Sequence, residues 1–99
     1  MNTKNTGAIS NINLPKQKLA ALARQRERFV RMRPVLLMVE ERAKAKPDNI
    51  LELNLRLWDA FKQNNSSEMT RLLRAGARVD SIEENLRTEE RNIKTRRYV

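Results

Sequence analysis

The chain has 99 residues, with 21 Lys and Arg against 12 Asp and Glu, which gives a formal net charge of +9. Cysteine and histidine are both absent, and this excludes disulfides, thiol nucleophiles, Cys/His zinc sites and imidazole acid–base catalysis. A chain of this length can form one domain with a modest core, because only 39% of its residues are hydrophobic and 4% are aromatic.

The composition favours helix along the whole chain. Only 2 Gly and 3 Pro interrupt a sequence rich in Leu, Arg, Glu, Lys and Ala. No segment alternates apolar and polar residues with β-branched enrichment, so strands are not expected. We therefore predict an all-α fold, a small bundle of about four to five helices around a central helical hairpin at about residues 49–76. A kinked N-terminal helix pair and a charged C-terminal helix would complete it.

The first residues differ in composition from the rest. Residues 1–13 are polar and rich in Asn and Thr, so we predict a disordered N-terminal arm there and a single helical domain over residues 14–99. Asn13 can cap a helix that begins with Leu14 and Pro15, since proline suits the first turn.

This first helix should end or kink at Pro34, because the residue before a proline is steered away from helical geometry. The next segment, residues 35–46, opens with apolar residues and becomes charged after Glu40, which predicts a second helix of the pair. On the first helix, four apolar residues share one face: Leu19, Leu22, Phe29 and Val30.

A different face of the first helix is basic. Arg24, Arg28 and Arg31 follow the i, i+4, i+7 spacing of one helical ridge. Arginine presents a rigid fork of donors that fits phosphate, and a nearby polyanion would relieve the repulsion between these side chains. A solvated face that only aids solubility is the alternative. We predict a nucleic-acid-binding surface, for DNA or RNA, made by Lys16, Lys18, Arg24, Arg26, Arg28, Arg31 and Arg33.

The first helix of the central hairpin carries the only Trp of the chain. Leu51, Leu55, Trp58 and Phe61 recur at spacings of four, three and three, which places them on one face of a helix. We expect the hairpin to form the core on which the stability of the domain depends, with Trp58 and Phe61 largely buried.

The second helix of the hairpin has a short apolar stripe, and Gly76 follows it where a left-handed C-terminal cap is expected. The run from Leu72 to Asp80, LLRAGARVD, resembles the closing half of an ankyrin repeat. The likeness covers about residues 57–81, lacks the Thr-Pro-Leu-His opening of that family and has no second copy in the chain. It implies a helix–turn–helix unit that binds a protein partner.

The sequence of residues 82–97 predicts a charged helix. Ser81 with Glu84 matches a capping box, as does Asp80 with Glu83 if the helix begins one residue earlier. Two i, i+4 ion pairs are expected on this helix, Glu83–Arg87 and Glu90–Lys94.

The apolar residues of this last helix form only a thin stripe, Ile82, Leu86 and Ile93. Such a stripe buries too little to hold the helix alone, so we predict that it binds a protein partner or a second copy of the chain. This favours the alternative function, a protein-interaction adaptor or inhibitor that uses the ankyrin-like hairpin and this helix.

No enzyme site emerges from the remaining residues. The acidic pairs Glu40/Glu41, Glu83/Glu84 and Glu89/Glu90 are adjacent on helices, so their side chains point about 100° apart and cannot flank one bond. The serines have no histidine partner, and there is no Gly-rich phosphate loop. We expect no catalytic activity, no metal and no cofactor.

A membrane partner is not expected either. No apolar run approaches the roughly 18 residues of a membrane span, and the N-terminus lacks the apolar region of a secretory signal. The sequence therefore favours a protein of the cytoplasm.

Overall fold

The computed structural model describes the backbone of residues 2–44 and 46–96, and the side chains of residues 16–44 and 46–95. Over these ranges the chain forms four helices and no strand, which confirms the prediction of an all-α fold. The helices are α1 (Asn2–Arg42), α2 (Ile50–Lys62), α3 (Ser66–Arg74) and α4 (Asp80–Arg96).

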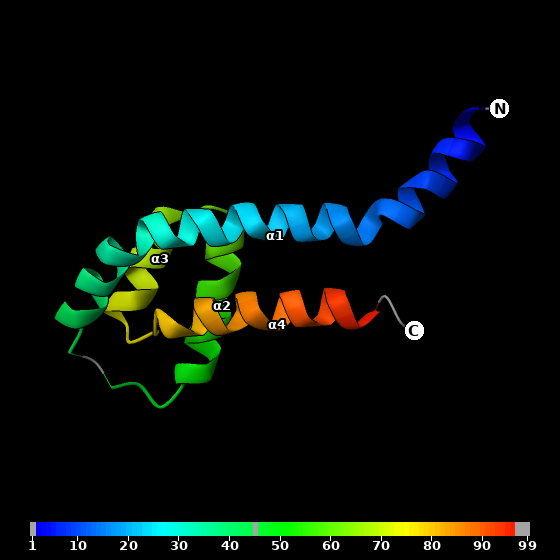
Figure 1. Ribbon diagram of the computed structural model, residues 1–99. Coiled ribbons are helices and arrows are strands. Elements are labelled where there is room, and N and C mark those ends of the chain that lie inside the picture. The colour runs from blue at the N-terminus through cyan, green and yellow to red at the C-terminus, as the bar shows by residue number, and fades with distance from the viewer. Residues whose placement is uncertain (1, 45, 97–99) are drawn as a thin grey trace.

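The long helix α1 spans the molecule, and the other three helices pack along one side of it (Figure 1). α4 runs antiparallel to the middle of α1, while the α2–α3 hairpin lies across the pair and contacts both. The blue N-terminal part of α1 extends beyond the other helices (Figure 1). The fold is therefore elongated, with extents of 58 × 24 × 18 Å.

α1 is one helix where the sequence predicted a pair. Its hydrogen-bonded run continues through Pro34 to Arg42, although the helix changes direction in its last turns (Figure 1). The kink was therefore predicted correctly and the break was not. Proline removes only one helical donor, and the helix stays continuous because Phe29 and Leu36, on either side of Pro34, are both buried in the same core.

The other end of α1 includes most of the segment for which a disordered arm was predicted, residues 1–13, and that arm stays a prediction. The backbone is helical from Asn2 onward, so the predicted cap at Asn13 is an internal helical residue. The side chains of this segment lie outside the described residues, and the division of the chain at residue 13 stays a prediction.

The core forms where the hairpin meets α1 and α4. Phe61 is fully buried, and its ring packs edge-on to Phe29 of α1 at 6.0 Å and stacks on Trp58 at 5.7 Å. The expected burial of Trp58 and Phe61 is thus confirmed. The other fully buried side chains come from α2, α3 and α4 and the α3–α4 connection: Leu57, Met69, Leu72, Leu73, Val79, Ile82 and Leu86.

Three residues of the apolar faces identified in the sequence are exposed. Leu51 is 77% and Leu55 64% exposed, because α2 turns the side that carries Leu53 and Leu57 toward the core. On α1, Val30 is 62% exposed. Only one side of α1 is covered, and Val30 is rotated about 100° from the inward-facing residue before it.

The predicted left-handed cap of α3 is confirmed. Gly76 has φ 118°, a conformation that a residue with a Cβ adopts at a steric penalty. The Ala77 amide donates to the carbonyl of Leu72 at 3.0 Å, and the Gly76 amide donates to the carbonyl of Leu73 at 3.1 Å. This pair of bonds is a Schellman motif, and it reverses the chain toward α4.

The start of α4 is capped differently from the prediction. No capping-box bond joins Ser81 and Glu84 in the described part, and the Ser81 hydroxyl donates to the carbonyl of Arg78 at 2.7 Å instead. α4 begins at Asp80, so Val79 is the residue before the helix, and its amide donates to Glu40 of α1 at 2.6 Å. A carboxylate from a distant helix therefore caps α4 and ties it to α1.

Replacing Glu40 with alanine is expected to lower the free energy of unfolding by about 1–3 kcal/mol, because the buried Val79 amide loses its acceptor. Glu40→Gln keeps an acceptor oxygen and should lose less. Glu41→Ala is the matched control, since Glu41 is exposed and forms no hydrogen bond in the described part. Urea unfolding of the three variants checks this order, and equal stability of Glu40→Ala and Glu41→Ala would contradict it.

Candidate nucleic-acid interface

The seven basic residues predicted as a nucleic-acid-binding surface all lie on α1, but the structure does not place them on one face. One points inward, one pairs with α4, two lie beside α4 and three lie on the uncovered side. These are Arg28, then Arg26, then Lys18 and Arg33, and finally Lys16, Arg24 and Arg31.

Arg28 points into the fold. Its Nη2 donates to the carbonyl oxygen of Phe61 at 2.5 Å, and its guanidinium lies 4.4 Å from the centroid of the Phe61 ring. That carbonyl belongs to the last turn of α2, where the helix dipole is negative and favours a cation. Arg28 Nε is buried without a partner. Arg28 therefore fastens α1 to α2 and is not available to a ligand.

Two further arginines are engaged at the surface. Arg26 pairs with Glu90 of α4 at 3.1 Å and so links the two antiparallel helices. Arg31 pairs with Glu27 one turn earlier on α1, at 3.5 Å, and both side chains are largely exposed. Because an exposed ion pair contributes only about 0–1 kcal/mol, Arg31 can exchange Glu27 for a phosphate at little loss.

Lys18 and Arg33 are exposed but lie on the side of α1 that faces the other helices. Lys18 lines a shallow groove together with Trp58 of α2 and Glu89 of α4. Arg33 lines a second groove with Glu83 of α4. Each therefore has an acidic side chain in the same groove.

The uncovered side of α1 carries what we call the outer row, which consists of Lys16, Arg24 and Arg31, all exposed. At 100° and 1.5 Å per residue, these residues lie within about 80° of one another and span about 22 Å. Lys16 and Arg24 form no ion pair among the described residues. The outer row is thus a line of cations with a single acidic neighbour, Glu27.

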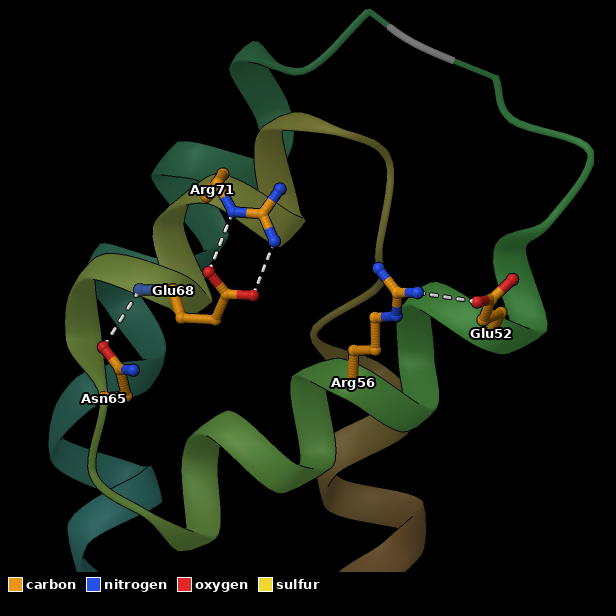
Figure 2. A network of polar contacts seen from close by, with 5 residues as sticks. All are labelled: Glu52, Arg56, Asn65, Glu68 and Arg71. Carbon is orange, nitrogen blue, oxygen red and sulfur yellow. Dashed lines mark hydrogen bonds and ion pairs between the residues drawn. The ribbon is translucent and has the colours of Figure 1, made fainter.

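The hairpin surface has the opposite character (Figure 2). Arg71 donates from Nε and Nη2 to the two carboxylate oxygens of Glu68 at 2.8 and 2.5 Å, and Arg56 donates to Glu52 at 2.8 Å. The hydrogen bond from Arg71 holds the pKa of Glu68 below its ordinary value of 4.5. The charges on this surface are balanced locally.

Sequence reasoning missed a second basic group, which we call the end cluster: Arg42, Lys44 and Arg74. These side chains line one hollow, although Arg74 is the last residue of α3, Arg42 is the last residue of α1 and Lys44 lies in the connection that follows α1. The position of Arg42, eleven residues after Arg31, places it close to the same side of a regular helix and could have suggested it. The sequence around Arg74 gives no sign that the end of α3 lies beside the end of α1.

The residues predicted for a protein partner lie in the interior. Ile82 and Leu86 are 0% and 1% exposed, and Ile93 is partly buried against the same core. α1 packs along α4 and covers this stripe, and the binding of a protein partner by these residues stays a prediction. The two ion pairs predicted on α4 are present, Glu83–Arg87 at 3.1 Å and Glu90–Lys94 at 3.6 Å.

Within the described ranges there is no group of three or more acidic side chains arranged to hold a metal ion. No helix in that part of the chain is both long and apolar enough to cross a membrane. Comparison with protein-family models, curated proteins and solved structures gave no match.

Proposed function

We propose that this protein binds nucleic acid along the phosphate backbone through the outer row of α1, as a non-enzymatic accessory protein of the cytoplasm. The observation that carries the proposal is the exposure of Lys16, Arg24 and Arg31 on one uncovered side of the helix, with one acidic neighbour among them. The formal net charge of +9 adds a long-range attraction for a polyanion.

Binding of this kind is mainly electrostatic. Each phosphate that a lysine or arginine neutralises releases condensed counterions, so affinity falls steeply with salt. Contacts to phosphate position a protein on the strand but carry no sequence information, which comes from hydrogen bonds to base edges. The outer row consists of cations only, so we expect weak sequence preference and binding to both DNA and RNA.

Fluorescence anisotropy with labelled duplex DNA, measured at several salt concentrations, tests the proposal. If each of the three cations of the outer row neutralises one phosphate, together they contribute about −3 to the log–log slope on duplex DNA. The variant Lys16→Gln/Arg24→Gln/Arg31→Gln keeps helix propensity and removes three contacts, so its slope should be smaller by about three units.

The matched control is Arg56→Gln/Arg71→Gln/Arg87→Gln, which removes the same charge from α2, α3 and α4. Each of these arginines is exposed and paired with a carboxylate on its own helix. The control should change the slope by less than about one unit. Equal losses in both triple variants, or no binding by the parent protein at 50 mM salt, would refute the outer row as the binding surface.

A further inference from the structure

The end cluster lies where two helices finish together. α1 ends at Arg42 and α3 ends at Arg74, and the two helix ends lie side by side at the end of the molecule away from the blue start of α1 and the red end of α4 (Figure 1). Three of the five side chains that line the hollow between them are cationic, and the other two are Val39 and Ala43.

No acidic side chain balances these three cations. Neither Arg42, Lys44 nor Arg74 forms an ion pair in the described part of the chain. The nearby carboxylate of Glu40 is already engaged, since it accepts from the Val79 amide and pairs with Arg78 at 3.6 Å. The end cluster therefore has no carboxylate of its own.

The ends of the two helices supply only part of the missing negative charge. Each helix C-terminus acts as roughly −0.5 of an elementary charge, so two of them offset about one of the three cations. A charge of about +2 remains around one hollow. The cations thus do more than neutralise the helix dipoles, and the hollow favours a small dianion.

We propose that the end cluster is a binding site for a phosphate dianion, either a phosphate monoester or free phosphate. A monoester carries about −1.5 to −2 charges at pH 7 and has three acceptor oxygens, so it matches both the residual charge and the number of donor side chains. The phosphodiester inside a strand carries only one charge. Two arginine forks from different helices also suit the oxygens of a terminal phosphate better than point charges would.

A phosphate group of this charge can come from two sources. One is the terminal phosphate of a nucleic-acid strand, and this source rests on the proposed function. Arg42 lies eleven residues, or about three helical turns, beyond Arg31 of the outer row, so a strand lying along α1 would bring its end to the hollow. The other source is free inorganic phosphate, which needs no strand.

The test compares a single-stranded oligonucleotide that carries a terminal phosphate with the same oligonucleotide without it, for the 5′ and the 3′ end separately. The full-length protein should bind the better phosphorylated form at least about fivefold more tightly. Arg42→Gln/Lys44→Gln/Arg74→Gln should abolish this preference, whereas Arg56→Gln/Arg71→Gln/Arg87→Gln should keep it. A preference below twofold in the parent protein for both ends would rule out the strand end as the ligand.

Inorganic phosphate distinguishes this inference from the proposed function. At millimolar concentration and constant ionic strength it should raise the thermal midpoint of the parent protein and not that of the end-cluster variant. If oligonucleotides fail to bind but phosphate still has this effect, the proposed function is wrong and the site stands, with free phosphate as its ligand. If neither the terminal phosphate nor inorganic phosphate has an effect, the site is refuted.

The end-cluster variant needs its own stability control. Arg42 and Arg74 are the last residues of α1 and α3, where a positive charge also stabilises the helix end. The helix content of the variant is measured first by circular dichroism. Arg42→Lys/Arg74→Lys keeps the charge at both helix ends and removes both forks, so it should stay folded and still lose most of the preference for the terminal phosphate. Full preference in this variant would contradict the role of the two arginine forks.

Discussion

Replacing Phe61 with alanine is expected to lower the free energy of unfolding by about 3–5 kcal/mol, which is a large part of the stability of a small domain. Phe61 is fully buried, and its ring contacts Phe29 and Trp58 and the guanidinium of Arg28. Alanine would leave a cavity at the junction of α1 with α2 and would remove the surface on which Arg28 rests.

Urea unfolding followed by circular dichroism measures this effect, and Leu55→Ala is the matched control on the same helix. Leu55 is 64% exposed, so its replacement should change the free energy of unfolding by less than about 0.5 kcal/mol. Comparable losses in the two variants would mean that α2 buries the face on which Leu55 lies, as the sequence spacing indicated.

The spacing of apolar residues predicts that α2 is a helix but does not determine which face of the helix is buried. The spacing of Leu51, Leu55, Trp58 and Phe61 predicted a helix correctly, but α2 is apolar around much of its circumference, with Leu53 and Leu57 on a neighbouring face. Which face is buried depends on where α1, α3 and α4 lie. Trp58 and Phe61 were predicted correctly because they belong to both faces.

Features that depend on neighbouring residues were predicted better than features that depend on distant ones. The cap at Gly76 needs only the last turn of α3, and the sequence shows all of it. The cap of α4 uses Glu40, which is 39 residues from the Val79 amide that it accepts from. A capping box within residues 80–84 was the best local prediction, and the packing of α4 on α1 replaced it.

The difference between local and distant contacts also explains which residues of the predicted basic ridge stay exposed. Helical spacing placed Arg24, Arg28 and Arg31 on one ridge, and the exposed pair among them, Arg24 and Arg31, remains in the outer row. Arg28 leaves the ridge because the end of α2 offers it a carbonyl and an aromatic ring. The charge pattern of a helix therefore identifies candidate binding residues, and tertiary contacts decide which of them stay free.

Arg28 allows this last point to be tested. Arg28→Ala is expected to lower the free energy of unfolding by about 1.5–3 kcal/mol, because it removes a charge-assisted hydrogen bond and uncovers the ring of Phe61. Arg28→Met should change it by less than about 1 kcal/mol. Methionine still covers the ring, the buried and unpaired Nε disappears, and the Phe61 carbonyl keeps a second donor in the Asn64 amide at 3.0 Å.

The effect of a substitution on nucleic-acid binding should depend on whether the side chain is exposed in the structure, and not on its place in the helical spacing. Arg24→Met removes an exposed cation of the outer row and should reduce the salt slope by about one unit. Arg28→Met removes the same formal charge from a side chain that points into the fold, so its slope should stay within about half a unit of the parent value. Anisotropy titrations at matched salt compare the two. If the two variants lose equal amounts of salt slope, Arg28 also contacts nucleic acid. The contact between Arg28 and the end of α2 would then have to open when nucleic acid binds.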